Sequence, residues 1–212
     1  MSEQTIWGIH AGQYGEADEL FRERNVIAIG DYMGDLSGWK DREDYKNAYV
    51  KANPGSAKMK VAINAGVCYR FVHEIQRHDL VVYPAKYTGE VLIGRIVGDY
   101  QYAPNISKEY PNQRKVEWVR PVPRTGFSQG ALYEMGAAMT LFQIKNYAHE
   151  ILAVLEGKPI PPDDEDETIS LVTEDIEQQT RDFVLKRLSQ ALKGHPLSEG
   201  ETEKGTFYFS LA

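Results

Sequence analysis

NAGVCYRFVHEIQRHDLVVYPAKYTGEVLIGRIV, residues 64–97, is the stretch of the sequence that decides the fold. Its first part has apolar residues at i, i+4 and i+8, which predicts one face of a helix over residues 58–76. That face is formed by Val67, Phe71 and Ile75. Two apolar runs follow, at 80–83 and 91–97, and their β-branched residues predict two strands joined by a polar loop.

The motifs of this stretch occur in an order that resembles a known family. They are Asn64-Ala65-Gly66-Val67 with Tyr69-Arg70, then His78-Asp79-Leu80-Val81-Val82-Tyr83, then Ile93-Gly94 with Ile96-Val97-Gly98, and later Tyr110-Pro111-Asn112. By these motifs the chain resembles the EVE branch of the PUA-like superfamily, which is related to YTH and ASCH domains, although His78 stands where that family usually has glycine. The resemblance implies a nucleic-acid-binding domain that holds a single, often modified, base in an aromatic pocket.

A second resemblance covers more of the chain. Its motifs run in order from Trp7-Gly8-Ile9-His10-Ala11-Gly12 through Gly34-Asp35-Leu36-Ser37 and Arg114-Lys115-Val116-Glu117-Trp118 to Leu192-Lys193-Gly194-His195-Pro196-Leu197. These motifs look like the N-terminal targeting region of Mrr-type modification-dependent restriction endonucleases. In that family a nuclease domain follows, so we expect this chain to be similar to the targeting half without the cutting half.

The composition fits a globular protein without an obvious special class. The chain has 212 residues, 42% of them hydrophobic, and one cysteine, so an internal disulfide is excluded and a cytoplasmic setting is expected. We find no run of 18 apolar residues and no N-terminal signal pattern in the sequence. The net charge of −7 is concentrated in residues 158–212, which hold 6 Lys+Arg and 12 Asp+Glu, against 18 and 19 in residues 1–157. The near-neutral first part therefore permits nucleic-acid binding without requiring it.

The remaining pattern predicts an α+β fold with a PUA-like curved, mostly antiparallel sheet or partly open barrel of five or six strands and surrounding helices. Further strands are expected at 5–10, 26–29, 113–119 and 140–144, and further helices at 16–24, 41–52 and 145–155, with another beginning at Ser128. We divide the chain into a binding domain, an acidic proline-containing linker, a C-terminal helix and a flexible tail. Their ranges are 1–157, 158–173, 174–196 and 197–212.

The resemblance implies which side chains form the base pocket. Candidates on the first strand, the loop after the second strand, the long helix and the rim are His10, Asp31, Tyr32, Asp35, Trp39, Asn64, Tyr100 and Tyr102. The aspartates and the asparagine would bind the Watson–Crick edge, and the aromatic rings would stack on the base. Each has a structural alternative: Asx-turns for the aspartates, a backbone cap for Asn64 and loop packing for Tyr32 and Trp39.

Basic residues are the candidates for phosphate contacts, which fix register without reading sequence. We select Lys58, Lys60, Lys86, Arg114 and Lys115, with Arg70, Arg95, Arg120 and Arg124 as further members. Trp7 and Trp118 alternate with apolar neighbours and are expected in the core.

The sequence leaves three functions open. The first is a DNA-binding specificity module that flips a modified base, 5-methylcytosine or 5-hydroxymethylcytosine, out of duplex DNA and performs no reaction itself, with a nuclease supplied by a missing domain or partner chain. The second is an RNA or RNA-modification reader of the EVE/YTH kind. The third is a metal-dependent nuclease with Asp99 and Gln113-Arg114-Lys115 as its weak motif. We predict no cofactor, no metal site in the first two cases, no membrane partner, and a homo-oligomer as an option through the C-terminal helix.

Overall fold

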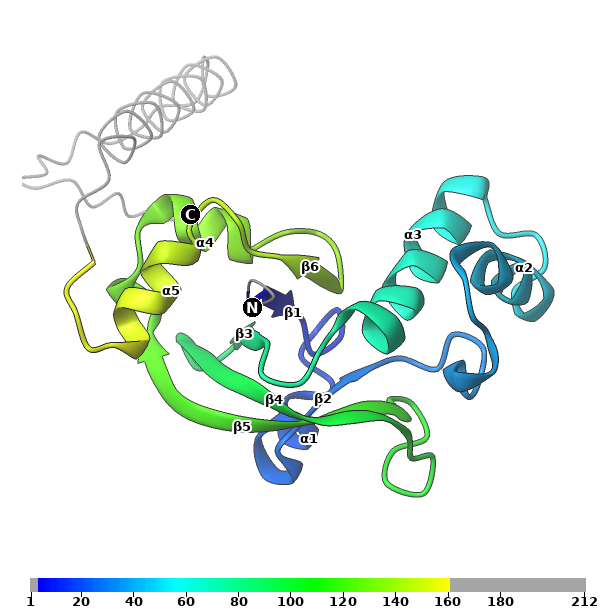
Figure 1. The fold of residues 1–212 in the computed structure, drawn as a ribbon, viewed down its shortest axis with the longest axis horizontal. Helices are drawn as coiled ribbons and strands as arrows, with labels where there is room; N and C mark the ends of the chain where they lie inside the picture. The colour runs from blue at the N-terminus through cyan, green and yellow to red at the C-terminus, as the bar shows by residue number, and fades with distance from the viewer. Residues whose placement is uncertain (1–3, 161–212) are drawn as a thin grey trace, which may run out of the picture. The chain divides into compact units, whose positions relative to one another are not determined.

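The computed structural model describes residues 4–160, which form one sheet with helices on both of its faces (Figure 1). The strands are β1 (Ile6–Ile9), β2 (Val26–Ile29), β3 (Leu80–Pro84), β4 (Glu90–Tyr102), β5 (Asn112–Pro123) and β6 (Leu141–Gln143). The α-helices are α1 (Asp18–Arg24), α2 (Arg42–Ala52), α3 (Lys58–Tyr69), α4 (Gln129–Met135) and α5 (Ala148–Leu155), and shorter turns are η1 (Leu36–Gly38), η2 (Arg70–Glu74) and η3 (Arg124–Gly126). The predicted C-terminal helix at 174–196 and tail at 197–212, and all but the first three residues of the predicted linker at 158–173, lie outside the described residues.

The six strands follow the order β2-β5-β4-β3-β1-β6. β1 pairs with β3 in parallel, and the other neighbouring pairs are antiparallel. The long strands β4 and β5 bend along their length (Figure 1), so the sheet is curved. The α+β class with a curved, mostly antiparallel sheet is confirmed, and no helix within residues 4–160 has the length and apolarity needed to span a membrane.

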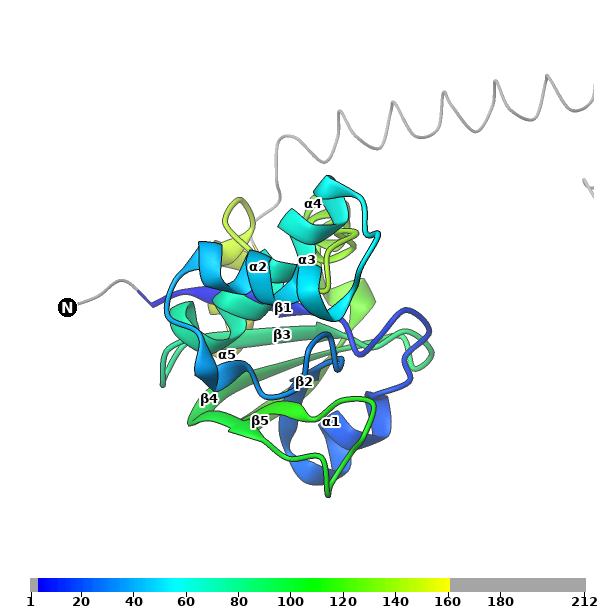
Figure 2. The ribbon, with the colours of Figure 1, turned by 90° about the vertical axis from the view of Figure 1, so that its right-hand side faces the viewer.

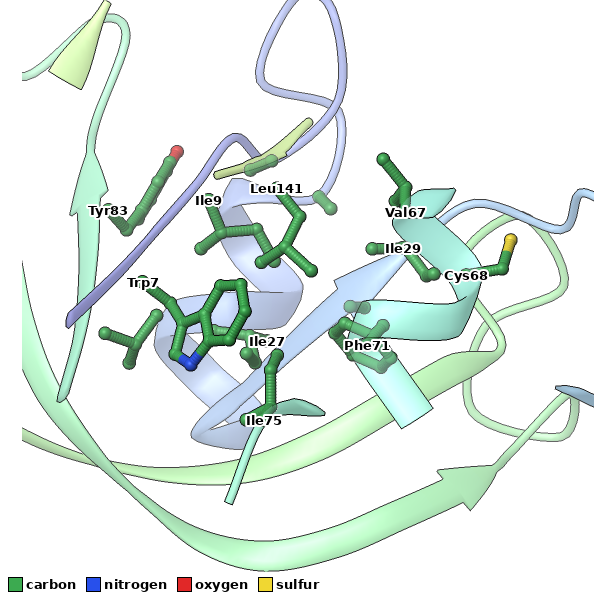
Figure 3. Close-up of a cluster of buried hydrophobic side chains, with 14 of the residues drawn as sticks. Trp7, Ile9, Ile27, Ile29, Val67, Cys68, Phe71, Ile75, Tyr83 and Leu141 are labelled. Carbon is green, nitrogen blue, oxygen red and sulfur yellow. The ribbon is translucent and has the colours of Figure 1, made fainter. Parts of the chain in front are cut away.

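Each face of the sheet is buried against a different set of helices. Alternate residues of β1 illustrate the division, because Trp7 and Ile9 join one apolar cluster while Ile6 joins the other. The first cluster also takes Ile27 of β2 and Phe71 after α3, and Figure 3 shows these side chains converging although β1 and β2 are not neighbours in the sheet. The curvature of the sheet therefore encloses this cluster, with α1, α2 and α3 contributing to it, whereas α4 and α5 cover the second cluster.

The long helix predicted over 58–76 ends earlier, at Tyr69, and continues as the π-helical turn η2. A buried arginine accounts for this ending. Arg114 of β5 donates from Nε to the carbonyl oxygen of Phe71 and from Nη2 to that of Val72, both at 2.7 Å, so it satisfies the free carbonyl groups of the turn. Because only 4% of Arg114 is exposed, its predicted role as a surface phosphate contact is wrong.

β5 extends beyond the strand predicted at 113–119 and includes Pro121 and Pro123. Its pairing with β2 covers only Asn112 to Lys115, so beyond that point β5 is an edge strand. An edge strand tolerates Pro121 and Pro123 because no neighbour requires their missing N–H groups.

The residue at the end of the loop before β3 adopts a backbone conformation that favours glycine. His78 has a φ of 75°, in the left-handed region that favours glycine. The next residue, Asp79, is 6% exposed and accepts hydrogen bonds from Trp7 Nε1 at 2.9 Å and from the Gln76 amide at 2.9 Å. Trp7 is buried, as predicted, and Trp118 packs against the same cluster while partly exposed.

Candidate base-binding pocket

A pocket of about 550 Å³ opens where β1 ends. Four segments of the chain form it: the loop after β1, the end of β3 with the β3–β4 turn, η3, and the segment from the end of α4 to β6. Its principal lining residues are His10, Gly12, Gln13, Tyr83, Lys86, Arg124, Gly136, Ala137, Ala138 and Thr140. The volume lies within the range of about 300–1,000 Å³ typical of small-molecule sites.

His10 is the predicted base-binding residue that lines this pocket. Its Nε2 lies 2.8 Å from the carbonyl oxygen of Ala137, and its ring is 5.4 Å from that of Phe142. A carbonyl only accepts, so Nε2 carries the proton. Burial, and secondarily the positive charge of Lys86, lower the pKa of His10. The imidazole is therefore neutral at pH 7 and keeps Nδ1 as a hydrogen-bond acceptor.

The loop after β1 depends on a glycine at its centre. Gly12 has a φ of +82°, and a Cβ there would lie 2.3 Å from Tyr110 Oη. The loop is held further by Glu16, whose carboxylate accepts from the Tyr14 amide at 2.8 Å. A glycine is therefore required at this position, and its absence of a side chain lets the backbone of the loop line the pocket directly.

Exposed aromatic and basic side chains gather around the loop that borders the pocket. Lys86 donates to the carbonyl oxygen of Gln13 at 2.7 Å, and its ammonium lies 5.0 Å from the centre of the Tyr14 ring. Tyr14 and Tyr87 are 60% and 74% exposed, and the Cβ position of Gly15 is 3.3 Å from the Tyr87 ring. Such exposure of aromatic rings beside a pocket suits stacking on a planar ligand.

The two predicted aspartates serve the loop after β2 instead. Asp31 accepts from the Gly34 amide at 2.7 Å, and Asp35 accepts from the Ser37 amide at 3.0 Å. These are the Asx-type turns that the sequence left open as the alternative. Hydrogen bonds from the Ser37 amide and the Tyr100 hydroxyl lower the pKa of Asp35.

The remaining predicted base-binding residues engage one another or the core. Asn64 donates to Tyr49 Oη at 2.7 Å, and Trp39 lies edge-on to Tyr45 at 5.6 Å. Tyr100 shares its single hydroxyl proton between Asn112 Oδ1 at 2.7 Å and Asp35 Oδ1 at 3.1 Å, and it accepts from the Leu36 amide at 2.8 Å. Tyr32 packs against the first cluster and is hydrogen-bonded with Thr140 of the pocket wall, and Tyr102 is 37% exposed in β4. The structure therefore does not bring these residues together with His10 in one pocket.

Four of the five selected phosphate-binding residues are exposed: Lys58 and Lys60 on α3, Lys86 beside the pocket and Lys115 on β5. Lys86 alone among the five lines the pocket of His10.

The weak nuclease motif does not form a cluster of free ligands. Both oxygens of Asp99 bind the Arg77 guanidinium, at 3.0 and 2.7 Å, and this pairing lowers the pKa of Asp99. Gln113 is 3% exposed and donates to the carbonyl oxygen of Tyr110. Among residues 4–160, no group of three or more His, Cys, Asp or Glu side chains is placed to hold a metal ion.

The sequence analysis selected His10 and Lys86, but it did not select the other residues in and around the pocket. For the exposed ring of Tyr14 the sequence does contain a signal, because the residue stands between Gly12 and Gly15 in a glycine-rich loop. The segment Gly136 to Thr140 carries no comparable signal, because it contributes mainly backbone and small side chains.

Comparison with known proteins assigns the chain to a family. A protein-family model described as Domain of unknown function (DUF8426) matches residues 7–145, which include all but the first residue of β1, the whole of β2 to β6 and every segment that lines the pocket. No curated protein matches the chain.

Proposed function

Because the chain belongs to the family described as Domain of unknown function (DUF8426), whose description assigns no activity, we propose a function from the site itself. The domain binds nucleic acid and holds one extruded base in the pocket at the end of β1. The observation that carries this proposal is the pocket of about 550 Å³ with neutral His10 in its wall and Tyr14, Tyr87 and Lys86 around the adjoining loop.

The pocket offers the two kinds of contact that a base requires. A neutral His10 presents Nδ1 as an acceptor, which suits the exocyclic amine of cytosine or adenine. The exposed rings of Tyr14 and Tyr87 offer stacking surfaces, worth about 1–3 kcal/mol per base. Extrusion of a paired base costs a few kcal/mol, so edge contacts, stacking and backbone contacts together are of the size needed.

A modified cytosine in duplex DNA is the base that we propose first. The chain resembles the targeting region of modification-dependent restriction endonucleases, and an amine acceptor in the wall is compatible with cytosine. In this proposal the described domain selects the base and catalyses no reaction.

The experiment is an equilibrium titration at a fixed, stated salt concentration. It compares one labelled duplex carrying cytosine, 5-methylcytosine, 5-hydroxymethylcytosine or N6-methyladenine, together with the matching RNA. We expect a preference of tenfold or more, about 1.4 kcal/mol, for one modified cytosine. His10→Ala should abolish that preference, whereas His149→Ala, which removes an exposed histidine on α5, should retain it.

A second variant separates loss of the pocket from loss of folding. Ala138 is exposed and lines the pocket, so Ala138→Leu narrows the pocket without removing a structural contact of His10. We expect it to lower the base preference at an unchanged melting temperature. Equal binding of all duplexes by the wild type would refute base recognition, and stronger binding of the RNA would redirect the proposal to RNA.

A further inference from the structure

A second pocket, of about 370 Å³, is lined by a group of basic side chains. Arg42 of α2, Arg70 of η2 and Lys145 after β6 line it, together with the amide of Gln143 and the carboxylate of Glu74. The three cations come from three separate elements, so the fold and not the local sequence assembles them. Three positive groups and one negative group leave an excess of positive charge in the pocket.

Arg70 is the least satisfied member of this group. Among the described residues, its Nε is the one buried side-chain nitrogen or oxygen atom without a hydrogen-bond partner. Its Nη2 makes only a long hydrogen bond, 3.4 Å, to the carbonyl oxygen of Leu141. An unpaired buried donor is unfavourable, so the protein itself leaves the hydrogen-bonding capacity of Arg70 incompletely satisfied.

The charged side chains around Arg70 do not neutralise the positive charge of the pocket. Glu74 is ion-paired with Arg42, whose guanidinium also lies 4.7 Å from the centre of the Tyr69 ring. Burial, and secondarily repulsion from Arg42, lower the pKa of Arg70 against the opposing effect of Glu74. Lys145 is exposed and makes no ion pair with another residue of the described range. The one carboxylate is thus committed to Arg42, and an incoming anion would relieve the repulsion between the two arginines.

The segment before and within β6 connects this pocket with the base pocket. Ala137, Ala138 and Thr140 line the base pocket, whereas Met139 and Phe142 line the basic pocket. The Phe142 ring also contacts the His10 ring at 5.4 Å. The two pockets therefore share this segment as a common wall.

We propose that Arg70, Lys145 and Arg42 form a phosphodiester subsite that binds the backbone of the nucleic acid beside the extruded base. Phosphate oxygens match the paired donors of a guanidinium, and Gln143 adds a neutral donor. This inference rests on the proposed function, because it takes the base pocket as the neighbouring site. Such a subsite adds affinity and register but no sequence information.

The test measures the salt dependence of binding with the full chain. Wild type, Arg70→Gln and Lys145→Gln are titrated with modified and unmodified duplexes from 50 to 300 mM NaCl. Each phosphate contact adds about 0.9 to the slope of log K against log salt, so each variant should reduce the slope by roughly 1. Affinity at 150 mM salt should fall roughly threefold to tenfold, by the same factor for both duplexes.

Matched controls separate this subsite from a general charge effect. Lys108→Gln removes one exposed charge in the loop between β4 and β5, which lines neither pocket, and should leave the slope unchanged. Lys145 is exposed, so its substitution tests the subsite even if Arg70→Gln lowers the melting temperature.

The outcomes distinguish the two proposals. A base preference with unaltered slopes in both variants overturns the subsite and leaves the proposed function standing. Equal binding of all bases with reduced slopes supports the subsite and overturns base recognition. Absence of all binding by the wild type overturns both.

Discussion

At the scale of single residues, the protonation state of His10 links the pocket to the stability of the fold. Burial lowers the pKa of His10 below its ordinary value of 6.5. The unfolded chain therefore binds a proton at a higher pH than the folded chain does. Unfolding is favoured wherever the unfolded state holds more protons, so this residue makes stability fall as the pH decreases through and below 6.5.

We predict that His10→Gln removes this component of the pH dependence. Between pH 8 and 7 the free energies of unfolding of wild type and variant should run parallel. From pH 7 to 5 the wild type should lose more stability than the variant, because only the wild type must keep a buried imidazole neutral. Urea unfolding at pH 5, 6, 7 and 8 measures the difference, and parallel curves over the whole range would contradict the pKa assignment.

The candidate site could be predicted from sequence only in part, and single residues show why. His10 was named because the resemblance implies a pocket at the end of the first strand, and Lys86 was one of the basic residues selected for phosphate contacts. The carboxylates of Asp31 and Asp35 could accept hydrogen bonds from a base. In the structure they accept hydrogen bonds from backbone amides two or three residues away in the same loop. Arg114 looked like a surface charge because no local pattern reveals the carbonyl groups of Phe71 and Val72 that draw it inside.

At the scale of elements, the pairing of β4 with β5 leaves no space at one glycine. A Cβ on Gly94 would lie 2.7 Å from the Trp118 ring and 2.9 Å from the Glu117 carbonyl oxygen. The register shifts between Ile93 and Gly94, and Trp118 is held by a 2.8 Å hydrogen bond to the Phe21 carbonyl oxygen. Neither the strand nor the ring can move away easily.

We predict opposite effects for alanine at two glycines. Gly94→Ala should lower the free energy of unfolding by about 1–3 kcal/mol through overpacking. Gly66→Ala, inside α3 with nothing within 4 Å of its Cβ position, should raise that free energy by about 0.5–1 kcal/mol. Urea unfolding of the wild type and the two variants at pH 7.5 measures both changes. An unchanged free energy of unfolding in Gly94→Ala would show that β4 and β5 move apart to accept the added methyl group.

The local sequence pattern predicts where most helices and strands lie, but it does not predict the residues at which they end. Apolar runs and helical patterns located all six strands and the α-helices, because these elements bury apolar side chains. The early end of α3 and the extension of β5 through Pro121 and Pro123 depend on partners in other elements. The parallel pairing of β1 with β3 joins segments that are far apart in sequence, which no local signal contains.

At the scale of the whole molecule, the distribution of charge opposes the proposed partner. The chain has a formal net charge of −7, and residues 163–167 form an uninterrupted run of five acidic residues. Nucleic acid is repelled by such a charge at long range, whereas Lys86, Arg70 and Lys145 act at short range. Salt screens the long-range part first, because the Debye length falls from about 10 Å at 0.1 M to about 3 Å at 1 M.

We predict that neutralising this run in the full chain raises the affinity for duplex DNA at low salt. The variant replaces Asp163, Asp164 and Asp166 by Asn, and Glu165 and Glu167 by Gln. Affinity at 50 mM NaCl should rise several-fold for modified and unmodified duplexes alike, and the gain should shrink as salt is raised toward 0.5 M. The preference for one base should stay constant, since it depends on the pocket of His10 and not on net charge. An affinity that is unchanged at 50 mM would show that the run does not act on the binding surface, and a changed base preference would connect the run to the pocket itself.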